Sequence, residues 1–449
     1  MNFTRPPAVL LFILISTIST VAAPMRIATF EIDATPPLGS PLAYDKMTGR
    51  DVPLSCKGII IHGDQRPVVL CAVDWIGIGS TGQTEFKKAL ANATGTIPER
   101  VVVHTLHQHD SPRCNFAADD MLKQHGLSGT AFNVEHARSV IAAAGKAAKD
   151  AKLKFVTHVG HGEAEVKEVA SNRRILGSDG KVRTMRWTAC RDPKLRALPV
   201  GTIDPMMKTI SFWNTDRCLA VLSYYATHPQ SYYRTGAPSP DFPGLARNAR
   251  QEETGIPHIH FTGAGGNIGA GKWNDGSKKN RPILAAKLEA SMKGALENTE
   301  KKGVNSGALH WHVEPVLLPP SKHIDPVALK NIISDIRATP SKRFSAAKEL
   351  DWFQRCQLKE PVNITCMRIL DNQVLHMPGE LLVEYQLKAQ KMNSGAFVAV
   401  AAYGDYSMGY IATEEAYEQG GYEASAGASK VAPEVESVLL KAMEKLISQ

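Results

Sequence analysis

The segment at residues 101–112, VVVHTLHQHDSP, holds the densest group of potentially reactive side chains in the sequence. Its valine run predicts a buried strand, and His104, His107 and His109 lie at or just beyond the end of that strand. A neutral imidazole is the commonest metal-binding side chain, and it also titrates near neutral pH. In an extended chain His107 and His109 project to the same face. The spacing therefore indicates that one histidine could bind a metal while the other carries a proton beside it.

Three other apolar runs also lead to side chains that can bind a metal, namely His228, Glu380 and Tyr410. In open α/β sheets, ligands bind beyond the carboxyl ends of the strands. We therefore expect these three residues to lie close to His107.

Short apolar runs alternate with helical patterns along the chain, which favours an α/β fold. The predicted strands lie at residues 58–61, 67–74, 100–104, 154–159, 209–213, 218–226, 305–320, 373–377 and 396–402. The predicted helices lie at residues 134–151, 282–301, 326–338, 380–391 and 433–447. No internal repeat or long flexible linker separates them, so we expect residues 24–449 to form a single large domain.

Residues 1–23 have the pattern of a secretory signal peptide. Arg5 gives a positive start, residues 8–15 are apolar without interruption, and residues 21–23 fit a small-residue cleavage site. The apolar run is too short to cross a bilayer, and a membrane-anchored form is the alternative. We therefore expect a protein that is secreted or exported to the periplasm, where disulfides are permitted.

The distribution of charge limits the expected partners. Lys and Arg number 52 against 44 Asp and Glu, and they are scattered without a long basic run. We therefore expect no nucleic-acid partner, whereas weak peripheral contact with an anionic membrane surface stays open.

The seven cysteines are odd in number, so at least one is unpaired within the chain. Cys356 and Cys366 could close a short loop, and Cys71 and Cys218 are expected in the core.

Four motifs follow one another along the chain: His107-x-His109, His228-Pro229, Pro378-Gly379-Glu380 and Gly409-Tyr410-Ile411-Ala412-Thr413. In this order they resemble the N-terminal catalytic domain of the neutral/alkaline non-lysosomal ceramidases. Members of that family are secreted or surface zinc amidases that cleave the N-acyl bond of ceramide. The resemblance runs from residues 31–39 to residues 422–424 and so spans nearly the whole chain after residue 23. It implies a ceramidase-like catalytic domain in which mixed sheets are flanked by helices.

The resemblance implies a role for each matching residue, with Zn²⁺ as the cofactor. The implied zinc ligands are His107, His228, Glu380 and Tyr410. His109 would be the neighbouring proton carrier, Arg173 would lie on the substrate side, and Tyr422 would be a second active-site tyrosine. The spacing from Tyr410 to Tyr422 agrees with the spacing in the family.

The chain departs from the family pattern at two motifs. Where family members carry Gly-Asp-Val-Ser-Pro, with a proposed serine nucleophile, residues 266–270 read GNIGA, so Gly269 occupies the serine position. The His-x-His pair is followed by DSP at residues 110–112 rather than by Ser-Gly-Pro. The family's immunoglobulin-like C-terminal domain is also expected to be absent. These departures favour attack by zinc-bound water, with no serine nucleophile.

We therefore expect a secreted zinc-dependent hydrolase that cleaves an N-acyl (amide) bond of a small-molecule or lipid-like substrate. One alternative is an esterase or carbohydrate-directed deacylase on the same scaffold, which the altered loop at Gly269 motivates. Another is a non-catalytic exported metal-binding protein that has kept the metal-binding residues. A test of acyl-bond turnover with and without zinc separates these hypotheses.

Structural interpretations of several of these residues also stay open. Glu380 could simply be a carboxylate at the start of a helix, where the helix dipole favours it, and Tyr410 could be a core aromatic. Asp74 is either a polar site residue or a strand cap, and Asp110 could orient a histidine. The glycine-rich loop at residues 262–272 is either an anion-binding loop or a tight turn. Its spacing does not fit a nucleotide-binding loop.

Overall fold

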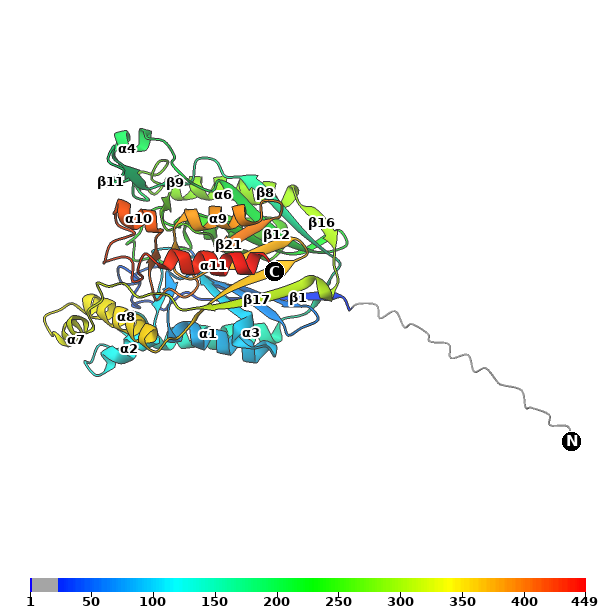
Figure 1. Cartoon of the computed structure of the whole chain (residues 1–449), viewed down its shortest axis with the longest axis horizontal. Helices are drawn as coiled ribbons and strands as arrows, with labels where there is room; N and C mark the ends of the chain where they lie inside the picture. Colours follow the sequence, from blue (N-terminus) through cyan, green and yellow to red (C-terminus); the bar gives the residue numbers. More distant parts are fainter. Residues whose placement is uncertain (2–22) are drawn as a thin grey trace.

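The computed structural model describes residue 1 and residues 23–449, so most of the expected signal peptide lies outside the described residues. Three β-sheets form the centre of the described part, and helices cover their outer faces (Figure 1). This mixed α/β architecture of sheets flanked by helices confirms the predicted fold class.

The first sheet has five strands in the order β5-β3-β2-β1-β7. Its strands are β1 (Met25–Asp33), β2 (Ser55–His62), β3 (Val68–Val73), β5 (Val101–Thr105) and β7 (Lys154–Val156). All neighbours pair antiparallel except β3 and β5, which pair in parallel. Helices α1 (Thr81–Thr94) and α3 (Val134–Asp150) pack against one face.

The second sheet has the order β14-β13-β12-β8-β16, and the third has the order β17-β18-β19-β21. The second contains β8 (His158–Glu165), β12 (Met206–Asn214), β13 (Arg217–Tyr225), β14 (His258–Thr262) and β16 (Glu300–Gly303). The third contains β17 (Leu309–Val316), β18 (Val362–Ile369), β19 (Asn372–His376) and β21 (Val398–Ala401). Helices α5 (Asp241–Thr254) and α6 (Asn280–Glu297) cover the second sheet, and α9 (Val383–Met392) and α11 (Val435–Ile447) cover the third.

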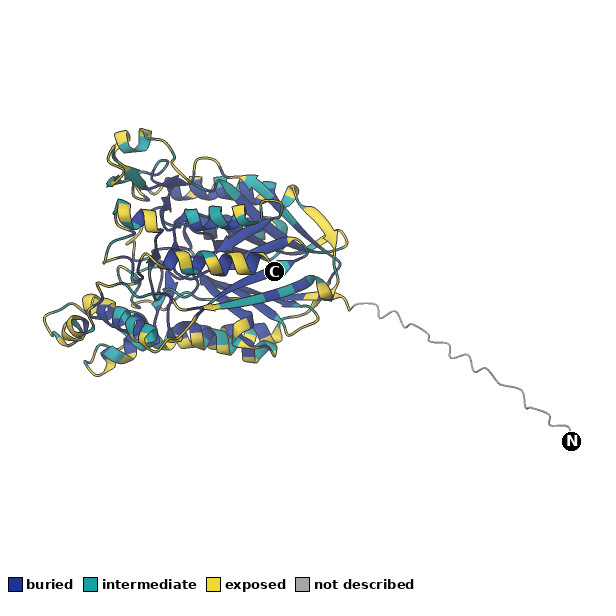
Figure 2. Ribbon diagram, viewed as in Figure 1, coloured by how far each residue is buried: buried dark blue, intermediate teal, exposed yellow. Residues whose placement is uncertain are grey.

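The inner faces of the three sheets meet in one apolar core. Ile59 of the first sheet, Phe212 of the second and Met367 of the third belong to the same buried cluster. Because strand side chains alternate between faces, the neighbouring residue Ile60 points outward and packs in the cluster that α1 and α3 complete. The central strands are accordingly mostly buried, and exposed residues lie on helix surfaces, in loops and on strands at the sheet edges such as β16 (Figure 2).

Each sheet contains one parallel strand pair: β3–β5, β13–β14 and β19–β21. The carboxyl ends of two parallel strands lie at the same edge of a sheet, so the loops that follow them gather there. These loops carry His107 after β5, His228 after β13, Glu380 after β19 and Tyr410 after β21. The fold therefore brings together the segments that the sequence analysis singled out.

Further helices and short strands connect the three sheets, and several of them lie on the side of the molecule away from the point where the described chain begins (Figure 1). The helical ones are η1 (Pro98–Arg100), α2 (Phe116–Lys123), α4 (Pro193–Ala197), η2 (Ser306–Ala308), α7 (Pro326–Ser334), α8 (Pro340–Gln357) and α10 (Glu414–Gln419). The short strands are β4 (Gly77–Ile78), β6 (Arg113–Cys114), β9 (Ser171–Asn172), β10 (Arg174–Leu176), β11 (Val182–Met185), β15 (Ile268–Gly269), β20 (Glu380–Leu381) and β22 (Tyr410–Ile411).

Two sequence-based expectations need correction. The helix predicted from Glu380 begins only at Val383, because Glu380 and Leu381 form strand β20, which pairs in parallel with β22. Cys356 and Cys366 do not form the local loop, since all seven cysteines are free thiols. Cys71 lies in the core as predicted, whereas Cys218 is only half-buried.

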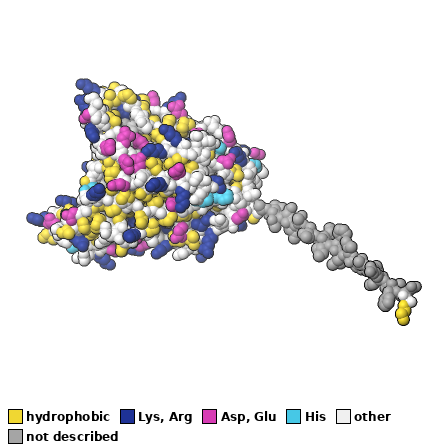
Figure 3. Space-filling model, viewed as in Figure 1, with side chains coloured by type: hydrophobic (Ala, Val, Ile, Leu, Met, Phe, Trp, Pro, Cys, Tyr) yellow, Lys and Arg dark blue, Asp and Glu magenta, His cyan; other side chains and the backbone are white. Residues whose placement is uncertain are grey.

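No helix among residues 23–449 combines the length and apolar character that a bilayer span requires. On the face drawn in Figure 3, Lys and Arg side chains are interspersed with Asp and Glu.

Candidate metal centre

His107 is held in a fixed orientation just beyond strand β5. Its backbone is in the left-handed region, with φ of 70°, a conformation that histidine adopts more readily than most residues. Its Nδ1 lies 2.5 Å from the carbonyl oxygen of Ile76. Because a carbonyl only accepts hydrogen bonds, Nδ1 donates the hydrogen bond to it, and Nε2 is the ring nitrogen left to face other groups. That Nε2 atom lies 3.1 Å from Oε2 of Glu380.

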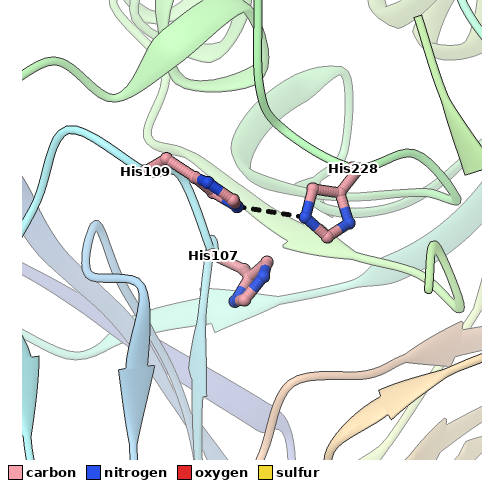
Figure 4. A group of neighbouring side chains, drawn as sticks. All are labelled: His107, His109 and His228. Carbon is pink, nitrogen blue, oxygen red and sulfur yellow. Dashed lines mark hydrogen bonds between the residues drawn. The ribbon is translucent and has the colours of Figure 1, made fainter. Parts of the chain in front are cut away.

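His109 and His228 complete a compact group of three buried imidazoles (Figure 4). One ring nitrogen from each of His107, His109 and His228 lies within 4.8 Å of the others, so this group could hold a metal ion. Nε2 of His109 is 3.1 Å from Nε2 of His228. Burial lowers the pKa of His109 and of His228 well below the ordinary value, and the charges of His107 and Arg173 act in the same direction. Both rings are therefore neutral at neutral pH and have lone pairs for a cation.

Glu380 brings a carboxylate to the same place. Its Oε1 accepts a 2.5 Å hydrogen bond from the Tyr406 hydroxyl, and its Oε2 faces the imidazoles, 3.9 Å from Nδ1 of His228. Burial opposes its ionisation, but His107 and the Tyr406 hydroxyl outweigh burial and lower the pKa of Glu380. Glu380 therefore remains an anion, and it is not a helix-capping residue, because α9 begins three residues later.

Tyr410 lies beside Glu380 because the pairing of β20 with β22 sets the two residues directly opposite each other. Its hydroxyl accepts a 2.8 Å hydrogen bond from Nη2 of Arg173. The Nε atom of Arg173 donates to Glu423 at 2.7 Å. Burial raises the pKa of Tyr410 well above the ordinary value, and the guanidinium of Arg173 opposes that rise. The arginine thus supports whatever negative character develops on the phenol oxygen.

A cavity of about 930 Å³ is lined by every predicted site residue except Gly269. The predicted residues that line it are His107, His109, Arg173, His228, Glu380, Tyr410 and Tyr422. The ring of Tyr422 stands edge-on to Tyr410 at 5.5 Å and is 44% exposed. Tyr44 stacks on His109 at 5.2 Å, and Tyr233 meets His109 edge-on at 5.3 Å. The cavity therefore connects the imidazole group with solvent through an aromatic surround.

Gly269 does not line this cavity, and its surroundings leave no room for a side chain. It belongs to the short strand β15, which pairs with β9. A Cβ atom built on Gly269 would lie 2.7 Å from Cγ2 of Thr188. The glycine-rich loop around it serves backbone packing: the N–H of Gly266 donates to the carbonyl of Leu381 at 2.8 Å. None of residues 262–272 lines the cavity, so the loop is not an anion-binding element of this site.

The two acidic residues with open interpretations have structural partners. Asp74 is buried and forms a two-pronged ion pair with Arg247 at 2.7 and 2.9 Å. Asp110 does not orient a histidine: its carboxylate accepts hydrogen bonds from the backbone N–H groups of Arg234 and Thr235. Asp110 thereby fixes the loop that carries Tyr233 against His109.

Tyr403, Tyr406 and Glu423 also contact the site residues, and, like Tyr44 and Tyr233, none of them is predicted from the sequence. The ring of Tyr403 stacks on His107 at 4.6 Å, and Tyr406 binds Glu380. Tyr403 and Tyr406 lie between β21 and Tyr410, so their position just after a strand end could have identified them as site residues. Glu423 directly follows Tyr422, but no local pattern marks its carboxylate as the partner of Arg173.

No protein-family model matches the chain, and no curated protein matches its sequence. Solved ceramidase structures do share its fold, so the fold of the chain is ceramidase-like. The neutral ceramidase from Pseudomonas aeruginosa superimposes with a TM-score of 0.69 at 16% identity, over 95% of this chain and 74% of that chain. A ceramidase determined in complex with C2 superimposes with a TM-score of 0.67 at 15% identity, over 95% and 75%. The predicted ceramidase-like fold is therefore confirmed.

Proposed function

We propose that this protein is a zinc-dependent amidohydrolase that cleaves the N-acyl bond of a small acylated substrate. One observation carries the proposal: two buried imidazoles, His107 and His228, converge with the ionised carboxylate of Glu380 at a buried point of a large open cavity. The likeness to solved ceramidase structures supports the class of reaction. We further propose export, on the strength of the pattern in residues 1–23.

The donor atoms fit a divalent cation. Oε2 of Glu380 and Nδ1 of His228 are both buried without a hydrogen-bond partner, and unpartnered buried polar atoms are costly in a protein that has nothing to bind them. Ligand atoms about 2.0–2.2 Å from a tetrahedral Zn²⁺ lie roughly 3.3 Å from one another. The 3.1 Å between Nε2 of His107 and Oε2 of Glu380 is close to that spacing. We propose Tyr410, which lies opposite Glu380 in the strand pairing, as the fourth ligand.

When bound, Zn²⁺ would polarise the substrate carbonyl and lower the pKa of a bound water towards about 7. The chain supplies the remaining functions. His109 faces the cavity and contacts His228, so it can deliver a proton to the leaving nitrogen. Arg173 holds the Tyr410 hydroxyl and also lines the cavity, where its positive charge favours negative charge on the carbonyl oxygen. No residue at position 269 takes part.

Chelation tests the function directly. We expect the purified chain to hydrolyse at least one N-acyl substrate, to lose that activity with a chelator and to regain it with Zn²⁺. Ceramide, a short N-acylated amine, an N-acetyl sugar and a carboxylic ester should be compared at equal concentration. Preferential ester or sugar turnover would assign the alternative deacylase activity. A zinc-loaded chain that turns over none of these substrates would contradict the proposal.

Replacement of His109 by alanine separates proton transfer from metal binding. We expect the His109→Ala variant to keep its zinc, because His107, His228 and Glu380 remain, while kcat falls by about 10²–10⁴-fold, the usual contribution of general acid–base catalysis. Zinc content and steady-state kinetics are measured on the same preparation. Loss of zinc together with activity would instead make His109 a ligand, as its closeness to the other two rings allows.

A further inference from the structure

A second, smaller cavity of about 290 Å³ adjoins the main one. The residues that line both cavities are Tyr44, Ser345, Lys348, Tyr406 and Tyr422. Tyr406 connects the two chemically, because its hydroxyl binds Glu380 while its ring faces Nζ of Lys348 at 5.5 Å. A group bound in this side cavity therefore lies one aromatic ring away from the proposed zinc ligands.

Two cations line the side cavity, and no carboxylate lines it. Lys348, on α8, forms no ion pair within the described residues. Arg113, on β6, donates one bond to the carbonyl of Ala43 and packs against the ring of Phe344 at 5.9 Å. Its Nε atom is buried without a hydrogen-bond partner. The side cavity thus carries two cations that form no direct ion pair with a carboxylate among the described residues, although Glu380 and Glu349 act on Lys348 from outside this cavity.

This arrangement contrasts with other buried cations of the chain. Arg247 is paired with Asp74, and Arg173 is paired with Glu423. Glu349, which lies beside Lys348 in sequence, is 2.7 Å from Lys430 and therefore already has a partner. Burial lowers the pKa of Lys348 to about 8, the charges of Arg113 and Lys430 act in the same direction, and the carboxylates of Glu380 and Glu349 oppose them only in part. Like charges brought together out of water are unfavourable, and an anion that enters between them relieves both the repulsion and the desolvation.

We propose that the side cavity binds a carboxylate of the substrate, and that the natural substrate is an anionic N-acylated compound such as an N-acyl amino acid. The reaction assigned to such a substrate rests on the proposed function, whereas the binding of its carboxylate does not. The volume equals roughly ten waters at about 30 Å³ each, which accommodates a carboxylate with a short side chain. Because the side cavity lies one aromatic ring away from Glu380, the carboxylate of the substrate must lie close to the scissile bond. A compact acylated amino acid meets both requirements.

The preference for an anion is measured with a matched pair of probes. N-benzoylglycine and its uncharged analogue N-benzoylglycinamide differ only at the carboxylate, and calorimetry gives their affinities for the zinc-loaded chain. We expect the acid to bind at least about tenfold more tightly than the amide. The Lys348→Met variant should lose most of that preference, and Lys348→Glu should reverse it. Lys342→Met, an exposed change of the same kind on the same helix, should leave the preference unchanged.

The carboxylate of the probe could also bind zinc. The Lys348 variants distinguish binding in the side cavity from binding to the metal. Lys348 is not among the proposed ligands, so zinc content stays constant while the preference changes. Equal affinity for the acid and the amide, or an unchanged preference in Lys348→Met, would overturn the inference. Displacement of N-benzoylglycine by inorganic phosphate at equal concentration would assign the cavity to a free anion and would also overturn it. Product analysis in the same samples reports hydrolysis separately, so a failed reaction does not hide a successful binding result.

Discussion

Replacement of both His107 and His228 by alanine is expected to abolish stoichiometric zinc binding and amide hydrolysis together. The two imidazoles supply two of the proposed ligands, and Glu380 and Tyr410 cannot hold the ion alone. Loss of a residue that only positions a ligand already lowers metal affinity or activity by about 10–100-fold. We therefore expect the loss of two ligands to lower both by more than roughly 100-fold. Metal content by elemental analysis and initial rates on one N-acyl substrate check this result.

The control for this experiment is His125→Ala, which removes a half-buried imidazole whose contact is with Gln124. The double variant leaves voids in a buried region, so its fold must be verified by circular dichroism and thermal unfolding. If it does not fold, the single variant His107→Asn answers the same question with a smaller change in volume. Zinc content equal to that of the wild type in a folded variant would show that the ion is bound elsewhere.

The strand ends of this fold could be predicted from local sequence. The valine run before His104 and the apolar run before His228 form β5 and β13 nearly as expected, because buried strands are marked by continuous apolar residues. The order of the motifs then indicated that His107, His228, Glu380 and Tyr410 would meet. His104 and His376 lie on the buried strands β5 and β19 and hydrogen-bond in the core, His104 to the carbonyl of Ala402 and His376 to His104.

Contacts between distant segments account for what local sequence could not show. Glu380 was placed at the start of a helix, but a pairing with Tyr410 thirty positions along the chain draws it into a strand. Asp110 follows the His-x-His pair, yet its hydrogen bonds go to a loop at residues 234–235. Arg113 and Lys348 share one cavity although neither belongs to a recognisable motif. Such partners depend on the packing of three sheets, which periodicity does not encode.

Glu423 illustrates the same limit, and it also has a large expected effect on stability. Its carboxylate is completely buried and accepts hydrogen bonds from Nε of Arg173 at 2.7 Å and Nη1 of Arg174 at 3.0 Å. Replacement by glutamine keeps the shape and removes the only acidic partner of both guanidinium groups within the described residues. Breaking a buried ion pair in this way costs about 3–5 kcal/mol. We expect Glu423→Gln to lower the free energy of unfolding by that amount.

We expect catalysis to suffer as well, because Glu423 holds Nε of Arg173 while Nη2 of the same side chain donates to the Tyr410 hydroxyl. Denaturant unfolding measures the stability of the variant, and kcat at saturating substrate and zinc measures the loss of positioning in the molecules that remain folded. Glu418→Gln, an exposed carboxylate change on α10, is the matched control and should change the free energy of unfolding by less than about 0.5 kcal/mol. If Glu423→Gln behaves like this control, the ion pair does not stabilise the fold. If kcat is unchanged in a destabilised variant, Arg173 does not depend on Glu423 for its place beside Tyr410.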